Sequence, residues 1–139
     1  MLKVKRLSSK ATLPRRMRDG DAGFDLYSVE TVFIEPGEIV TIPTGIAVEL
    51  PPNTCMILKD RSGLALKGLH ILAGVIDENY RGEIKVVMVN LSKNRITLSR
   101  GTRVTQALIL PYLSPEIVEV DTLSDTERGD KGFGSSGLF

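Results

Sequence analysis

Glycine or proline interrupts this chain every few residues, and no segment keeps a 3.6-residue apolar period for long, which excludes a fold built on long amphipathic helices. The segments between the interruptions are short and rich in β-forming residues, and turns such as Glu35–Glu38 (EPGE) separate them. About ten strands at this spacing predict an all-β sandwich, jelly roll or barrel. The predicted strands, besides a first one near Leu2–Val4, are Val32–Ile34, Ile39–Ile42, Gly45–Leu50, Thr54–Leu58, Gly74–Ile76, Ile84–Val89, Ile96–Leu98, Val104–Leu110 and Ile117–Val120.

One short helix is predicted, and no linker divides the chain. Ser62–Gly68 (SGLALKG) favours one or two helical turns. Residues 1–139 are therefore expected to form one domain, large enough to bury its own core. After Val120 the composition becomes polar and glycine-rich, so we expect a β core over residues 1–120 and a tail over residues 121–139. By composition the tail is either a disordered terminus or an arm that orders on a ligand or a neighbouring subunit.

Charge and reactive side chains narrow the classes of function. A net charge of +1 predicts no nucleic-acid or anionic-membrane partner. One cysteine and one histidine argue against a disulfide framework, a cysteine-rich zinc site and a histidine-based triad, so carboxylates are expected to supply any catalytic base. Pro14 breaks the acid-free N-terminal segment, which we interpret as a strand and a charged surface rather than as a mitochondrial transit peptide. The expected compartment is the cytoplasm.

Three motifs in the body of the chain each allow two interpretations, either a polar functional site or an ordinary structural role. Asp25 stands between two apolar neighbours and is either a paired or metal-holding acid or an outward-facing edge residue. Arg61 and Ser62 open the predicted helix and form either a phosphate nest or a helix start with Ser62 as N-cap. Gln106 is polar within a strong strand, where alternation alone would expose it.

The tail contains a glycine-rich motif, Gly132–Gly137, that matches G-x-G-x-x-G. It is not a dinucleotide fingerprint, because only two residues follow it and no helix can receive a pyrophosphate there. Its backbone amides, the hydroxyls of Ser135 and Ser136, and the charges of Arg128 and Lys131 are suited to phosphate binding.

The order of these motifs is more specific than any one of them. Together they resemble the five ordered motifs of the trimeric dUTPase family over nearly the whole chain. The matching segments are Ala22–Leu26 (AGFDL), Arg61–Gly68 (RSGLALKG), Gly74–Glu83 (GVIDENYRGE), Arg103–Gln106 (RVTQ) and Arg128–Gly137 (RGDKGFGSSG). The resemblance implies a jelly-roll-like distorted β barrel, a homotrimer with exchanged C-terminal arms, and active sites shared between chains.

The resemblance also implies an activity: Mg²⁺-assisted hydrolysis of dUTP to dUMP and pyrophosphate, which keeps uracil out of DNA and supplies dUMP for thymidylate synthesis. Asp77 is the implied general base, acting on a water that attacks the α-phosphorus. Asp25 is implied to assist the metal through water or to fix a neighbouring arginine. The implied substrate-binding residues are Arg61, Ser62, Gly63, Gly74, Ile76, Asp77, Tyr80, Gln106, Arg128, Phe133, Gly134 and Ser135.

Particular roles follow from the same resemblance. Gly74–Glu83 is expected to form a hairpin whose backbone binds the uracil edge, with Tyr80 against the deoxyribose where it would reject a 2′-hydroxyl. Phe133 is expected to stack on uracil when the arm closes over a site. The departures from the usual motifs are Asp60, Asn79 and Asp130–Lys131, and Asp60 is expected to pair with Arg61 or with another chain. Rival interpretations are a dCTP deaminase of the same fold and a non-catalytic nucleotide sensor.

Overall fold

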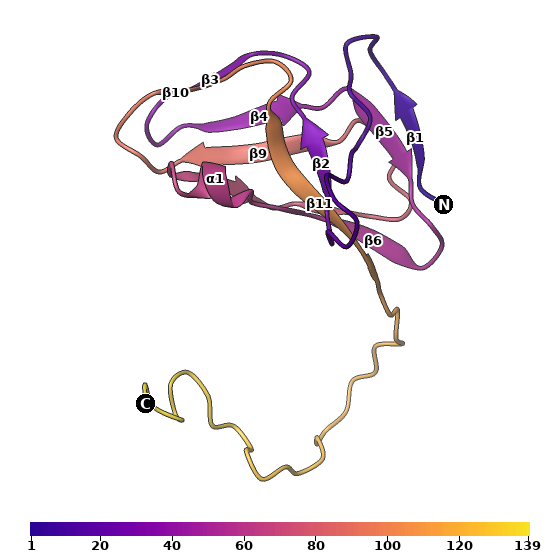
Figure 1. The fold of residues 1–139 in the computed structure, drawn as a ribbon. Coiled ribbons are helices and arrows are strands. Elements are labelled where there is room, and N and C mark those ends of the chain that lie inside the picture. Colours follow the sequence, from indigo (N-terminus) through magenta and orange to yellow (C-terminus); the bar gives the residue numbers. More distant parts are fainter.

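The computed structural model describes all residues, Met1–Phe139, and contains eleven strands and one short helix. The all-β prediction is therefore confirmed. Figure 1 shows the strands gathered into one body, from which the last part of the chain runs away. The elements are β1 (Lys3–Arg6), β2 (Phe24–Tyr27), β3 (Val32–Ile34), β4 (Ile39–Pro43), β5 (Ile46–Glu49), β6 (Thr54–Lys59), α1 (Ser62–Ala65), β7 (Leu69–Leu72), β8 (Val75–Ile76), β9 (Lys85–Asn90), β10 (Ile96–Leu98) and β11 (Arg103–Pro111).

The strands form four small antiparallel sheets. The largest has the order β2-β11-β6-β8, and a three-stranded sheet has the order β4-β9-β7. Two further pairs, β1-β5 and β10-β3, complete the body. Neighbours in each sheet are distant in sequence, so the body is held by long-range contacts between short elements.

Alternation along the strands builds the core. In β9, Val86 and Met88 point inward and are fully buried, while the residues that alternate with them are partly buried or exposed. Asn90 at the end of β9 is also buried, and its side-chain amide donates to the Ile34 carbonyl oxygen at 2.9 Å. This buried polar group therefore has a hydrogen-bond partner, as a stable core requires.

The predicted hairpin over Gly74–Glu83 is wrong. β8 pairs with β6, whereas β9 pairs with β4 and β7, so the connection between β8 and β9 crosses from one sheet to another. An alternation of side chains with a period of two predicts that a segment is a strand, but it does not predict which strand pairs with it. Gly74 begins this segment with φ of 102°, and a Cβ there would lie 2.9 Å from the Leu58 carbonyl oxygen. A side chain at position 74 would therefore force β8 away from β6.

Other boundaries differ from those expected. β7 was not predicted, and the helix is shorter, with Arg61 rather than Ser62 at the N-cap position and no side-chain cap. Ile117–Val120 forms no strand, because after Pro111 the chain leaves the sheet and has no neighbouring strand to pair with. Residues from Tyr112 onward are almost all exposed. The single helix of the structure, α1, is not long and apolar enough to cross a membrane.

Candidate active site

The candidate site begins with an irregularity in β11. The pairing of β11 with β2 shifts register between Arg103 and Thr105, so Val104 and Thr105 are both fully buried in succession. Arg103 and Gln106 are three residues apart, and in a regular strand their side chains would lie on opposite faces. The bulge instead brings both side chains to one cavity.

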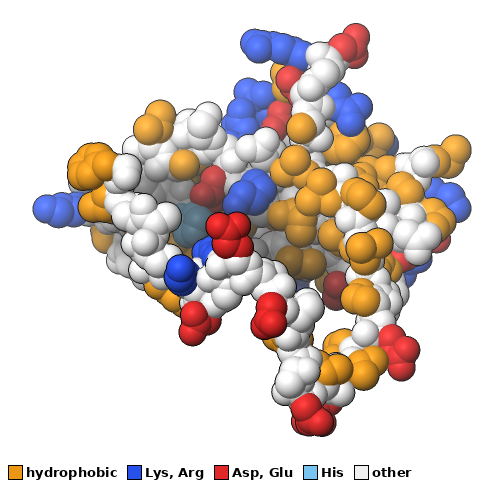
Figure 2. All heavy atoms as spheres, turned by 90° about the horizontal axis from the view of Figure 1, so that it is seen from below, with side chains coloured by type: hydrophobic (Ala, Val, Ile, Leu, Met, Phe, Trp, Pro, Cys, Tyr) orange, Lys and Arg blue, Asp and Glu red, His pale blue; other side chains and the backbone are white.

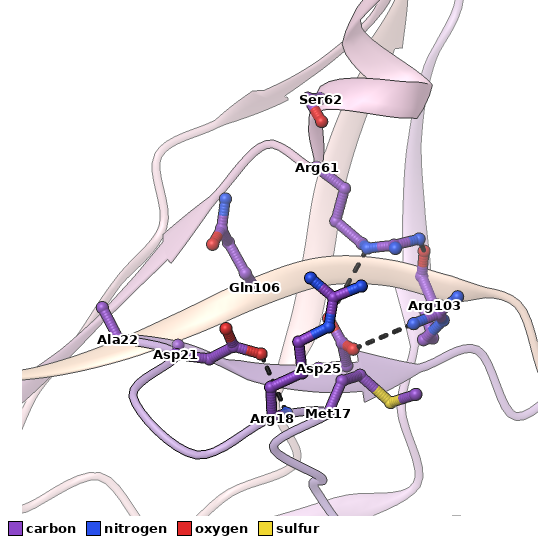
Figure 3. Close-up of a pocket in the computed structure, with 10 residues that line it drawn as sticks. Met17, Arg18, Asp21, Ala22, Asp25, Arg61, Ser62, Arg103 and Gln106 are labelled. Atoms are coloured by element: carbon purple, nitrogen blue, oxygen red, sulfur yellow. Dashed lines mark hydrogen bonds and ion pairs between the residues drawn. The ribbon is translucent and has the colours of Figure 1, made fainter.

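Asp25 in β2 holds two arginines at this cavity. One carboxylate oxygen lies 3.5 Å from Nε of Arg61, and the other lies 3.3 Å from a terminal nitrogen of Arg103 (Figure 3). The Arg61 guanidinium also donates to the Arg103 carbonyl oxygen at 3.3 Å. The Asp25 side chain is only 13% exposed, so this ion pair lies in a partly desolvated environment where it orients both guanidinium groups.

The Asp25 cavity has a volume of about 530 Å³ and is mostly polar. It brings together four of the residues expected from the sequence, namely Asp25, Arg61, Ser62 and Gln106. Gln106 is fixed by donating from its side-chain amide to the Asp60 carbonyl oxygen at 2.7 Å. Such a group of guanidinium, hydroxyl and amide donors is suited to a phosphate chain. The lining residues are Met17, Arg18, Asp21, Ala22, Gly23, Asp25, Arg61, Ser62, Arg103 and Gln106.

Asp60 does not pair with Arg61, the partner expected for it within the chain. One of its carboxylate oxygens lies 2.6 Å from Nδ1 of His70, and the other accepts the Ile71 amide proton at 2.7 Å. Asp60 therefore joins the start of the α1 segment to β7, which fixes the backbone just before Arg61. Gly63 lies in α1, where a Cβ would meet no atom within 4 Å.

The segment Asp77–Glu83, called here the Asp77 loop, lies outside the Asp25 cavity. Asp77 is exposed and lines two other cavities, of about 610 and 270 Å³. Ile76 and Tyr80 line the smaller one. The Tyr80 hydroxyl donates to the Glu83 carbonyl oxygen at 2.8 Å, and a Cβ on Gly82 would come within 2.5 Å of that hydroxyl. The tyrosine is thus held in one orientation over a glycine.

The Asp77 loop is tied to the first residue after β11. The Tyr112 hydroxyl donates to the Glu78 carboxylate. This hydrogen bond is the main cause that lowers the pKa of Glu78 from its ordinary value, and a hydrogen bond from the Asn53 amide adds to it. The same bond to Glu78 raises the pKa of Tyr112. The loop and the root of the C-terminal segment therefore share a polar contact.

The C-terminal residues expected in the site lie far along the exposed arm. Arg128, Lys131, Ser135 and Ser136 line a small cavity of about 380 Å³ within the arm itself. Phe133 is fully exposed with φ of 51°, and Gly134 follows it in a turn. In this single chain no residue of the arm lines the Asp25 cavity or either cavity beside the Asp77 loop.

Sequence reasoning missed several residues of the Asp25 cavity, above all Arg18 and Arg103. The sequence pattern assigned Arg18 to a solvated charge cluster, although its place four residues before the Ala22–Leu26 motif was a usable signal. Arg103 opens the RVTQ motif but received no role, because its contact with Asp25 spans 78 positions of sequence.

Fold and cavity together define a class: an all-β protein with an arginine-rich cavity whose donors suit a phosphate-bearing ligand. The family model described as dUTPase matches residues 9–137. Among curated proteins, the deoxyuridine 5′-triphosphate nucleotidohydrolase of Gloeothece citriformis is 49% identical over 99% of this chain and 97% of that protein. The protein of the same name from Clostridium kluyveri is 50% identical over 99% of both chains.

Solved structures agree with these relatives. A mutant dUTPase of Staphylococcus bacteriophage 80alpha, solved with dUpNHpp, is 34% identical, covers 99% of both chains and superposes with a TM-score of 0.94. A mutant dUTPase of phage phi11 of S. aureus, described as coordinating a structural Mg(II) ion, is 30% identical with a TM-score of 0.83 over 88% of this chain and 97% of that chain. The chain belongs to the dUTPase family.

Proposed function

We propose that this member of the dUTPase family hydrolyses dUTP to dUMP and pyrophosphate, with Asp77 as the general base. The observation that carries the proposal is the Asp25 cavity, which is lined by residues from three sequence motifs that match the family. The names of the curated relatives support the activity as a dUTP diphosphatase.

The Asp25 cavity is suited to the phosphate chain. Arg61 is held in orientation by Asp25, so little conformational entropy is lost when it binds an anion. Ser62 and Gln106 add neutral donors that bind oxygens without adding further charge. Donors fixed in this way stabilise charge that develops on the phosphate oxygens in the transition state.

The Asp77 loop is suited to the nucleoside and to the reacting water. In the proposed step, the water oxygen bonds to the α-phosphorus, its proton passes to the Asp77 carboxylate, and the bond from the α-phosphorus to the pyrophosphate oxygen breaks. A base of this kind contributes about 10²–10⁴ in rate. The backbone at Gly74 and Ile76 would bind the uracil edge. Tyr80, held by its bond to the Glu83 carbonyl oxygen, would form a rigid wall against a 2′-hydroxyl.

The complete site would be assembled from several copies of the chain. The Asp25 cavity and the two cavities beside the Asp77 loop share no lining residue, so one chain does not bring its phosphate-binding and nucleoside-binding parts together. This separation supports a homotrimer with shared sites. Figure 2 shows hydrophobic side chains gathered on the face of the body beside the arm, which supports burial of that face against another copy.

The arm is the third proposed part of the site. Its own apolar residues are exposed in the single chain, with Leu123 86% and Leu138 95% accessible, which supports docking on a neighbouring copy. Arg128 would meet the terminal phosphates, and Gly134 and Ser135 would offer amide and hydroxyl donors. Phe133 would stack on uracil and help to exclude water when the arm, residues 121–139, closes.

Mg²⁺ fits this site only as a hydrated ion bound to substrate phosphates. No group of three or more histidine, cysteine or acidic side chains is arranged to hold a metal. The Asp25 carboxylate already engages two guanidinium groups, so it fits a contact through water better than direct ligation. When bound, the ion would neutralise part of the triphosphate charge. The contacts of Asp25 favour the role of fixing arginines.

Pyrophosphate release from dUTP with Mg²⁺, measured beside dCTP, dTTP and UTP, tests the proposal. Release from dUTP alone is expected. Asp77→Asn should keep binding dUpNHpp while turnover falls by at least about 10². Release of ammonia from dCTP would favour the deaminase, and binding of dUTP without any hydrolysis would favour the sensor. Turnover unchanged in Asp77→Asn would remove Asp77 as the base.

A further inference from the structure

Arg18 lies at the exposed edge of the Asp25 cavity, on the loop that leads into β2. Figure 3 shows its side chain pointing from that loop toward the middle of the residues that line the cavity. Arg61 and Arg103 both pair with Asp25, whereas the guanidinium of Arg18 forms no ion pair within the chain. It is the one arginine of the cavity whose charge is not paired with a carboxylate of the chain.

The backbone of Arg18, not its side chain, builds the loop. The Arg18 amide donates to the Asp21 carboxylate at 3.0 Å, and the Asp21 amide donates to the Arg18 carbonyl oxygen at 3.2 Å. These two bonds close the turn and persist with any side chain at position 18. The guanidinium therefore has no structural task in the turn, and the Asp21 carboxylate is engaged by an amide.

Charge gives this arginine its importance. The cavity is lined by three arginines and two aspartates, which leaves one net positive charge, and removal of Arg18 would leave none. A monophosphate offers a single anionic group, for which Arg61, Ser62 and Gln106 supply donors. A triphosphate brings about four negative charges, so it needs additional cations.

We propose that Arg18 binds the phosphate chain of the nucleotide beyond the α-phosphate and so sets the preference for a triphosphate, an inference that rests on the function proposed above. The guanidinium reaches the phosphate chain from the loop that leads into β2. Because it is exposed, it acts through charge-assisted hydrogen bonds that are screened by salt.

Calorimetric binding of dUpNHpp and of dUMP to the full chain tests this role in wild type, Arg18→Ala, Arg18→Lys and Arg15→Ala. Arg15→Ala is the matched control, since it removes the same charge from the same segment but does not line the cavity. Arg18→Ala should weaken dUpNHpp binding about tenfold, the cost of one hydrogen bond to a charged group, and dUMP binding less than about twofold. Arg18→Lys should recover part of the loss, because it restores the charge without the bidentate fork.

The outcomes separate the two proposals. Arg18→Ala should also flatten the salt dependence of dUpNHpp binding, which a merely loosened loop would not do. Equal affinity losses for dUpNHpp and dUMP, or identical behaviour of Arg18→Ala and Arg15→Ala, would overturn the role of Arg18 while dUTP hydrolysis by the wild type stood. A wild type that neither binds dUpNHpp nor hydrolyses dUTP would overturn both.

Discussion

Replacing Asp25 by asparagine tests how much the partly buried ion pair with two arginines stabilises the fold. The amide keeps the shape of the carboxylate but leaves the guanidinium groups of Arg61 and Arg103 without a counter-charge. Breaking a fully buried pair costs about 3–5 kcal/mol and losing an exposed pair about 0–1 kcal/mol. Asp25 is 13% exposed and its partners 30% and 38%, so we expect the free energy of unfolding to fall by about 2 kcal/mol.

Glu35→Gln is the matched control for this prediction. Glu35 lies 3.0 Å from Nε of Arg95, a shorter contact than either one made by Asp25, but both side chains are more than half exposed. If burial rather than distance decides the energy, Glu35→Gln should cost less than about 0.5 kcal/mol. Denaturant unfolding at one fixed protein concentration would measure both variants, because assembly would make stability depend on concentration. Equal losses, or a larger loss for Glu35→Gln, would refute the reasoning.

Three further changes test the loop and the arm. Tyr112→Phe should lower the melting temperature near neutral pH, because it removes the hydrogen bond that lowers the pKa of Glu78 in the fold. This stabilisation is present above the ordinary carboxyl pKa of 4.5 and is lost as the pH falls through the folded pKa. The melting temperatures of the two proteins should therefore converge in acid, and a difference that stays constant with pH would contradict the assignment. A Cβ at position 82 would lie 2.5 Å from the Tyr80 hydroxyl, so Gly82→Ala should displace the tyrosine ring. We expect the ratio of kcat/KM for dUTP to kcat/KM for UTP to fall by about tenfold or more. An unchanged ratio would show that Tyr80 does not exclude ribose. Removal of Arg128–Phe139 should leave the melting temperature nearly unchanged, since no strand lies there. The same truncation should lower kcat for dUTP by at least about tenfold, because the arm can no longer close over the site. Full activity of the truncated chain would mean that the tail is only a disordered terminus.

Strand positions were largely predictable, and strand partners were not. Residues such as Val86 and Met88 alternate with more exposed positions, and this two-residue alternation depends only on neighbouring residues in the sequence. Whether β8 pairs with β9 or with β6 depends on contacts across tens of residues, which no local pattern encodes. Ile117–Val120 has strand-forming residues but no partner within the chain, so propensity alone was misleading there.

The candidate site was predictable by resemblance and only weakly from the chemistry of single residues. Asp25 alone left open whether the acid faces outward or is paired, and the structure shows it paired with two arginines. The roles expected for Asp77 and Phe133 depend on other copies of the chain and stay predictions. Arg18 escaped notice because a run of arginines is normally a solvated surface, and only the fold shows that one of them lines a cavity.

Because of the bulge in β11, the chemistry of the cavity depends on the number of residues in this stretch of the strand rather than on its amino-acid composition. Arg103 and Gln106 share a side only because one residue is supernumerary between them. A single-residue insertion between them, with the bulge kept, would turn one of the two away, although every other amino acid stayed the same. Over evolutionary time this stretch should therefore accept exchanges of side chain far more readily than a change in length by one.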